Sequence, residues 1–127
     1  MKIVTIIGAR PQIIKSSILR NIFNKNGIKE ILLHTGQHYD YEMSDIFFDE
    51  LSIKKPEYFL ELKNRSHASM ISQIIKDSEE ILIAEKPDIC ILYGDTNSTL
   101  AGAITASSLG IPICHIESGL RSYKKNM

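Results

Sequence analysis

Hydrophobic positions along the chain follow two alternating patterns. Short runs rich in Ile, Leu and Val predict buried strands, and the segments between them repeat apolar residues at helical spacing. The strand-like runs are 2–7, 30–35, 58–62, 88–93 and 111–117. The helix-like segments are 11–26, 41–51, 66–85 and 97–109. Because most of the strand runs are apolar on both faces, they predict a parallel sheet that is covered by helices on both sides.

This alternation predicts an α/β, Rossmann-like fold. Right-handed crossovers between successive strands most simply give a doubly wound sheet with strand order 3-2-1-4-5. In that order the first and fourth strands are neighbours, and the strand order reverses between them. Sheets of this kind bind ligands at the carboxyl ends of the strands, beside this reversal. The candidate site therefore lies in the segments "GARPQIIK" (8–15), "YGDTNST" (93–99) and "HIESGLRS" (115–122).

Two of the expected helices have distinctive compositions. The helix that follows Pro11 is indicated by apolar residues at helical spacing, which are Ile14, Ile18, Leu19, Ile22 and Phe23. The helix at 97–109 is rich in small residues, including Gly102. Small side chains would allow that helix to approach a sheet or a ligand closely.

Composition narrows the classes of function. The chain has 127 residues, which fits one domain, with 43% hydrophobic residues, 24% charged residues and a formal net charge of zero. This balance argues against a nucleic acid or a membrane surface as the partner of the protein. The first apolar run is too short for a signal peptide or a membrane span, so a cytoplasmic protein is expected. Cys90 and Cys114 lie in apolar runs and are predicted to be buried, reduced thiols.

The segment 8–15 is a candidate anion site. It lacks the glycine spacing of a dinucleotide-binding loop and the Gly-Lys-Ser/Thr ending of a P-loop. Gly8 permits a sharp turn, and Arg10 and Lys15 lie near the start of a helix, whose free amides favour an anion. The segment predicts a compact site of diphosphate size. A helix start with two solvated cations is the alternative interpretation.

Carboxylates follow the fourth and fifth predicted strands. Asp95 and Glu117 can transfer protons if the site tunes their pKa values, while cations support a departing phosphate. In the alternative interpretations, Asp95 caps the next helix and Glu117 pairs with Arg121. The chain shows no Ser-His-Asp arrangement and no metal-ligand spacing. His34 and His38 are four apart, but they lie on a strand-to-loop segment and form only a weak site with Asp40. No metal is therefore expected.

The motifs together resemble one enzyme family. They are "GARPQIIK" (8–15), "HTGQHYDYEMSDIFF" (34–48), "YGDTNSTLAGAI" (93–104) and "HIESGLRS" (115–122). In order and position they resemble the non-hydrolysing UDP-N-acetylglucosamine 2-epimerases, and in detail the branch acting on UDP-2,3-diacetamido-glucuronate. The resemblance covers nearly the whole chain. It implies the N-terminal Rossmann-like half of a two-domain GT-B fold, with the C-terminal nucleotide-binding domain absent from residues 1–127. We therefore expect this chain to be inactive by itself.

The resemblance also implies a reaction. The family inverts C2 of a UDP-2-acetamido sugar without a cofactor: UDP leaves C1 by anti elimination, and then adds back to the 2-acetamidoglycal. By motif, the catalytic positions fall on Asp95, Glu117 and Lys15. The positions for substrate binding fall on Gly8, Arg10, His38, Thr96, Asn97, Ser118, Gly119 and Arg121. A UDP-sugar is the implied substrate, and a homodimer is implied for the full-length protein.

The chain departs from the family pattern in two places. Ile13 stands where the first motif usually has an aromatic residue, which is a tolerable packing change. The segment 63–73 matches the usual glycine-rich loop only loosely. Three other functions stay open: the acceptor domain of a GT-B glycosyltransferase, a hydrolysing 2-epimerase, and a non-catalytic domain that partners with a separately encoded C-terminal half.

Overall fold

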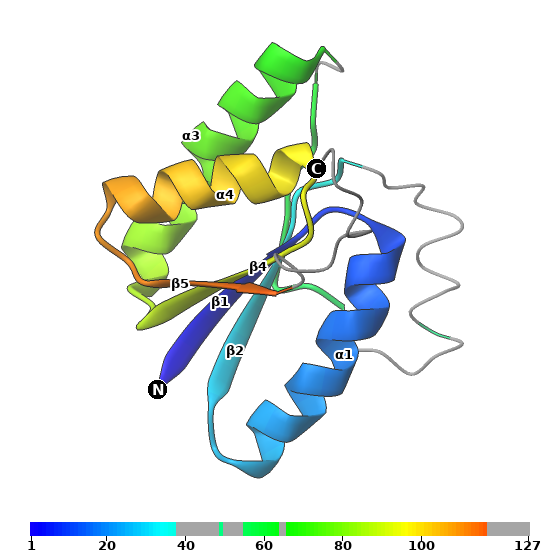
Figure 1. Ribbon diagram of the computed structural model, residues 1–127, viewed down its shortest axis with the longest axis vertical. Helices are drawn as coiled ribbons and strands as arrows, with labels where there is room; N and C mark the ends of the chain where they lie inside the picture. The colour runs from blue at the N-terminus through cyan, green and yellow to red at the C-terminus, as the bar shows by residue number, and fades with distance from the viewer. Residues whose placement is uncertain (38–48, 50–54, 64–65, 117–127) are drawn as a thin grey trace, which may run out of the picture.

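The computed structural model describes residues 1–37, 49, 55–63 and 66–116 (Figure 1). Its elements are β1 (Lys2–Ile7), α1 (Arg10–Lys25), β2 (Lys29–His34), β3 (Tyr58–Phe59), α3 (His67–Glu85), β4 (Ile89–Tyr93), α4 (Asn97–Ser108) and β5 (Ile113–Ile116). These elements confirm the predicted alternation, although β3 is shorter than expected. The helix predicted at 41–51 falls, except for residue 49, outside the described residues. No helix in the described ranges is long and apolar enough to cross a membrane.

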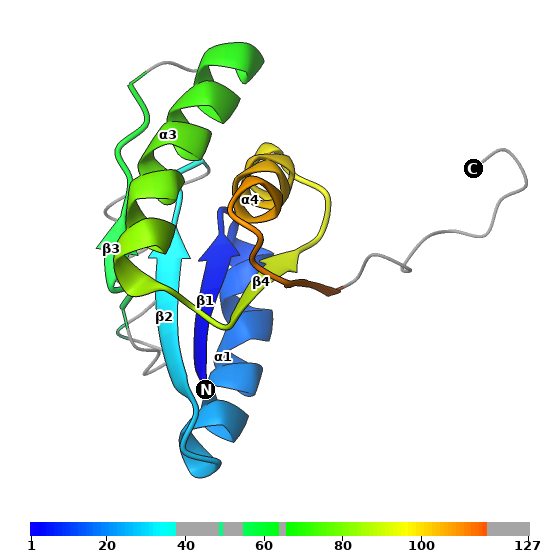
Figure 2. The same cartoon turned by 90° about the vertical axis from the view of Figure 1, so that its left-hand side faces the viewer.

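The sheet is parallel and five-stranded, with the order β3-β2-β1-β4-β5. The predicted strand order and fold class are therefore confirmed. Figures 1 and 2 show α1 on one face of the sheet and α3 and α4 on the other. The carboxyl ends of the strands lie at one edge, where α1 and α4 both begin (Figure 2).

The core consists of two apolar layers, one on each face of the sheet. Alternate residues of a strand point to opposite faces, so β1 contributes Val4 to one layer and Ile3 to the other. The layer beneath α3 and α4 includes Leu82 and Leu92, and the layer beneath α1 includes Tyr93. This two-sided burial explains why the strand-forming runs are almost continuously apolar.

The apolar residues of α1 are only partly buried. Ile14, Ile18 and Ile22 are 44%, 61% and 49% exposed, whereas Leu19 and Phe23 pack against the core beneath the helix. The buried face of the helix also carries Gln12 and Arg20. Both polar side chains find hydrogen-bond partners beneath the helix, and this compensates the cost of removing them from water.

The prediction that both cysteines are buried is correct for Cys90 and wrong for Cys114. Cys90 lies in β4 at the centre of the sheet, and burial raises the pKa of its thiol to about 12. Cys114 is exposed. It lies in β5, which is an edge strand whose residues 113–115 are all exposed. An apolar run predicts a strand, but it does not say whether the strand lies at the centre or the edge of the sheet.

A polar cluster, in which Arg20 and Glu30 are buried and Glu57 is exposed, holds α1 against β2. The Arg20 guanidinium donates to Glu57 Oε1 at 2.7 Å, and its Nε lies 3.8 Å from Glu30 Oε1. Thr5 Oγ1 donates to Glu30 Oε2 at 2.6 Å, and the Leu32 amide donates to Glu57 Oε1 at 3.2 Å. The cluster thus connects α1, β1, β2 and the residue before β3.

The short strand β3 is anchored by a second polar contact. The Tyr58 hydroxyl donates to Glu85 at the end of α3, and Lys2 Nζ lies 2.6 Å from Glu85 Oε1. Hydrogen bonds from Lys2 and then from Tyr58 hold the pKa of the Glu85 carboxyl below its usual value. Glu85 thus joins the edge strand β3 and the start of β1 to the end of α3.

Helix α4 approaches the sheet closely at Gly102, as its small residues predicted. A Cβ atom there would lie 2.7 Å from Leu92 Cδ2 and 3.2 Å from Ile6 Cδ1. We therefore expect Gly102→Ala to lower the free energy of unfolding by about 1–3 kcal/mol, because overpacking outweighs the gain of about 1 kcal/mol in helix propensity. Urea unfolding of the 127-residue chain measures this change.

The control for this substitution is Ser107→Ala. Ser107 is exposed on the same helix, so its replacement is expected to change the free energy of unfolding by no more than about 0.5 kcal/mol. A Gly102→Ala chain as stable as the wild type would contradict the close packing of α4.

Candidate active site at the carboxyl ends of β1 and β4

The candidate site lies where the strand order reverses. β1 and β4 are neighbours in the sheet, and Ile6 of β1 is in register with Leu92 of β4. The segment after β1 leads through Gly8 into α1, and the segment after β4 leads through Asp95 into α4. Because β1 and β4 are parallel neighbours, the two segments meet at one edge of the sheet, and α1 and α4 then cover opposite faces (Figure 2).

Gln12 bridges these two segments. Its side chain is buried, its Oε1 accepts from the Gly8 amide at 2.7 Å, and its Nε2 donates to the Tyr93 carbonyl at 3.0 Å. The same carbonyl accepts from Thr99 Oγ1 at 2.6 Å. Helices on opposite faces of the sheet thus hold one carbonyl at the end of β4. Sequence reasoning missed Gln12, although its position one helical turn after Gly8 was a usable signal.

A second buried glutamine joins the end of β2 to α4. Gln37 Oε1 accepts from the Ser98 amide at 3.0 Å and from Ser98 Oγ at 2.6 Å. Ser98 Oγ also lies 2.7 Å from Thr35 Oγ1. Gly8 packs against this cluster, since a Cβ atom there would overlap Ser98 Oγ and lie 2.8 Å from Thr35 Oγ1. Close approach is therefore the reason for glycine at position 8; Gln37 was not predicted as a site residue.

The interpretation of Asp95 as a helix cap is wrong. The N-cap of α4 is Thr96, whose side chain accepts from the Thr99 amide, while Thr99 Oγ1 accepts from the Thr96 amide. Asp95 precedes this capping box and is exposed. Its carboxylate makes no hydrogen bond or ion pair with the other described residues. Asp95 is therefore available to a ligand at the edge of the sheet.

The first turn of α1 differs from that of α4. Its N-cap is Ala9, which provides no side-chain cap, and Pro11 follows in the first turn. Lys15 is exposed on this helix. Arg10 begins the helix, and its side chain lies outside what the structure describes. Among the described helices, α3 and α4 have side-chain caps from Ser66 and Thr96, whereas the N-terminus of α1 has none, and this favours an anion there.

Two predicted binding residues have structural contacts in this chain. Thr96 caps α4, and Asn97 Nδ2 lies 2.8 Å from His67 Nδ1 and 3.9 Å from Met70 Sδ. Asn97 thus connects the starts of α3 and α4. The substrate-binding roles of Thr96 and Asn97 stay predictions.

The remaining predicted site residues lie outside the described residues. These are Glu117, His38, Ser118, Gly119 and Arg121. The last described residue, Ile116, is in register with Tyr93 and accepts from the Gly94 amide at 3.1 Å. The end of β5 therefore lies beside the segment that carries Asp95. The convergence of Asp95 with Glu117, and the pairing of Glu117 with Arg121, stay predictions.

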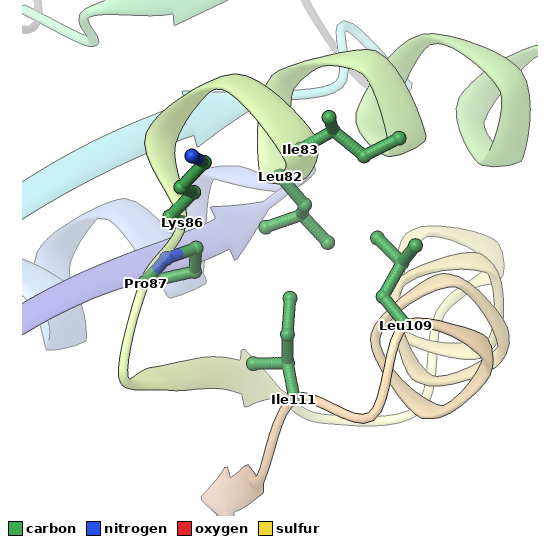
Figure 3. A pocket seen from close by; sticks show the side chains of 6 residues that line it. All are labelled: Leu82, Ile83, Lys86, Pro87, Leu109 and Ile111. Carbon is green, nitrogen blue, oxygen red and sulfur yellow. The ribbon is translucent and has the colours of Figure 1, made fainter.

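A hollow of about 320 Å³ borders the Asp95 segment. It is lined by Leu92, Gly94, Asp95, Thr96, Thr99, Leu100, Ala103, Ile113 and His115. A second hollow, of about 290 Å³, lies between the ends of α3 and α4 (Figure 3). Its lining is apolar except for Lys86, and it contains no predicted site residue. The first hollow borders Asp95, although most of its exposed lining is apolar.

No cluster of three His, Cys, Asp or Glu side chains suited to a metal occurs in the part of the chain that the structure describes. His34 has a structural environment. It is buried, its Nδ1 accepts from the Gly36 amide at 2.9 Å, and its ring stacks on Phe59 with centroids 5.1 Å apart. Of the predicted charged site residues, those with described side chains are Asp95 and Lys15.

Comparison with known proteins gives a consistent result. The family model described as UDP-N-acetylglucosamine 2-epimerase matches residues 20–127. The UDP-2,3-diacetamido-2,3-dideoxy-D-glucuronate 2-epimerase of Pseudomonas aeruginosa is 50% identical over 128 residues, covering 100% of this chain and 36% of the relative. A UDP-N-acetylglucosamine 2-epimerase homolog of Methanococcus maripaludis is 52% identical, covering 100% of this chain and 35% of the relative.

The solved structures agree with the sequence relatives. The UDP-GlcNAc 2-epimerase of Methanocaldococcus jannaschii, in complex with UDP-GlcNAc and UDP, superimposes with a TM-score of 0.88 at 42% identity. The superposition covers 100% of this chain and 35% of the Methanocaldococcus jannaschii chain. The present chain thus spans about a third of the length of the relatives it matches. By its sequence match and its fold, the chain belongs to the UDP-N-acetylglucosamine 2-epimerase family.

Proposed function

We propose that the chain is the N-terminal Rossmann-like domain of a two-domain GT-B enzyme that epimerises C2 of a UDP-2-acetamido sugar. The family membership and the coverage of about a third of each relative support this proposal. In it, a C-terminal nucleotide-binding domain completes the site, and residues 1–127 alone do not turn over. The complete protein is proposed to be a cytoplasmic homodimer that needs no cofactor.

The proposed reaction divides between the two sides of the site. The uncapped start of α1, with Arg10 and Lys15, binds the diphosphate and stabilises its negative charge as the bond from C1 to UDP breaks. A carboxylate, Asp95 or Glu117, removes the C2 proton, and the electron pair forms the C1–C2 double bond of the 2-acetamidoglycal. UDP then adds back to C1, and the other acidic residue, which is in its protonated carboxylic acid form, delivers a proton to the opposite face of C2 and becomes a carboxylate.

One observation carries this proposal: the exposed Asp95 carboxylate and the uncapped N-terminus of α1 follow adjacent strands at the same edge of the sheet. Proton transfer and phosphate departure need groups of these two kinds within reach of one substrate. The acceptor domain of a glycosyltransferase would share the sheet but would not need paired carboxylates after the fourth and fifth strands.

The proposed substrate is a class of compounds. The chain is 50% identical to a relative named for UDP-2,3-diacetamido-2,3-dideoxy-D-glucuronate and 52% identical to a homolog named for UDP-N-acetylglucosamine. These nearly equal values support a UDP sugar with a 2-acetamido group, which both names share. The acetamido group is the feature that the site must accommodate beside C2.

A chimeric enzyme tests the proposal. Residues 1–127 replace the matching 128 residues of the Pseudomonas aeruginosa relative, and the purified chimera is incubated in D2O with each of the two UDP sugars. We expect the C2 epimer of at least one, with deuterium at C2. The unaltered relative is the positive control, and residues 1–127 alone are expected to give no product. A folded chimera that gives only free sugar and UDP, or no product, would contradict the proposal.

A further inference from the structure

We propose that Gln12 is a positioning residue, which fixes the turn at Gly8 relative to the segment that carries Asp95. The inference rests on the proposed function, because these two segments are there assigned to the diphosphate and to the C2 proton. Gln12 itself is not expected to touch the substrate. Its role is to set the separation between the two groups that do.

The contacts of Gln12 support this role. The side chain is 6% exposed, so its amide is removed from water and depends on protein partners. The two ends of the amide are both used, with the oxygen at 2.7 Å from the Gly8 nitrogen and the nitrogen at 3.0 Å from the Tyr93 oxygen. One planar group therefore bridges the Gly8 amide after β1 and the Tyr93 carbonyl at the end of β4.

The position of Asp95 depends on the backbone that precedes it. Its carboxylate has no hydrogen-bond partner among the described residues, so no side-chain contact from that part of the chain fixes it. Gly94, the only residue between Tyr93 and Asp95, has a φ of 69°, and a Cβ atom there would lie 3.3 Å from Gln12 Nε2. The Gln12 amide thus packs directly against the turn that directs Asp95 toward the site.

A second glutamine provides a matched control. Gln73 Oε1 accepts from the Lys63 amide at 3.0 Å, and its Nε2 donates to the Glu61 carbonyl at 2.6 Å. It makes the same kind of two-ended backbone bridge, between α3 and the segment after β3. Gln73→Met and Gln12→Met therefore each remove one such bridge, and only Gln12→Met removes it from the candidate site.

The first experiment measures kinetics in the active chimera. Gln12→Met is expected to lower kcat at least tenfold while KM changes less than threefold, because misplacing reacting groups affects the transition state more than binding. Gln73→Met should leave both constants within twofold of the wild type. Gln12→Asn keeps the amide but is one methylene too short to span both partners, so it is expected to behave like Gln12→Met. It replaces Gln12→Met in the experiment if that variant does not fold.

The second experiment is independent of activity. Amide hydrogen exchange of the 127-residue chain follows the Gly94 amide, which donates to Ile116. Exchange there is expected to be at least tenfold faster in Gln12→Met and unchanged in Gln73→Met. An inactive wild-type chimera would contradict the proposed function and leave this exchange result to decide the role of Gln12. Unchanged Gly94 exchange, equal kcat in both variants, or a loss confined to KM would each overturn the inference.

Discussion

Replacing Asp95 with asparagine in the active chimera is expected to lower kcat by about 10²–10⁴-fold and to stop deuterium from entering C2. Asparagine has nearly the same shape, but its amide cannot accept the proton. Folding should be unaffected, because Thr96 and not Asp95 caps α4, and Asp95 is exposed. Mass spectrometry of the UDP sugar recovered from D2O measures the exchange, and thermal unfolding checks the fold.

Asp88→Asn is the matched control for this substitution. Asp88 precedes β4 at the other end of the strand, and its Oδ2 accepts from the Lys2 amide at 2.8 Å. Asparagine retains an oxygen acceptor there, so kcat is expected to stay within about twofold of the wild type. Undiminished deuterium incorporation in the Asp95→Asn enzyme would remove Asp95 from proton transfer and leave that step to another group.

Replacing Arg20 with methionine is expected to lower the free energy of unfolding by about 3–5 kcal/mol. Methionine fills much of the same volume, but it leaves Glu30 and Glu57 without the guanidinium that lies between them. Glu30 is buried, and an uncompensated carboxylate there is costly. A domain of this size is stable by only about 5–15 kcal/mol, so the loss is a large fraction of the total. Urea unfolding of the 127-residue chain measures it.

A second substitution tests the physical cause. Glu30→Gln removes the negative charge and keeps an acceptor for Thr5 Oγ1, so Arg20→Met combined with Glu30→Gln should be more stable than Arg20→Met alone. Lys25→Met removes an exposed cation from the last turn of the same helix and should cost less than about 1 kcal/mol. Equal costs for Arg20→Met and Lys25→Met would show that the cluster adds no stability.

Local patterns accounted for much of the architecture. A buried parallel strand is apolar on both faces, and this property is visible in the sequence without knowledge of the strand's neighbours. Right-handed crossovers then restrict the order, and the order places Gly8 and Asp95 on adjacent strands. The proximity of the two segments was therefore predictable from alternation and chirality alone.

The residues that hold the two segments in place were not predictable in the same way. Gln12 was overlooked beside the apolar positions of α1, because its partner Tyr93 is 81 positions away in the chain. Gln37 and Ser98 are 61 positions apart. A polar residue in an amphipathic helix is normally solvated, and only the packing of the helix on a particular strand shows that it is buried and paired.

The sequence by itself determined the strand order, and it predicted that a ligand binds at the edge of the sheet where Asp95 and the start of α1 lie. Only the tertiary structure decided that Gln12 is buried while Ile14 is exposed, that Thr96 caps α4, and that Cys114 lies on an open edge. The reason is that periodicity records which residues can face a core. The rotation of a helix about its axis is decided by the polar partners that distant strands provide.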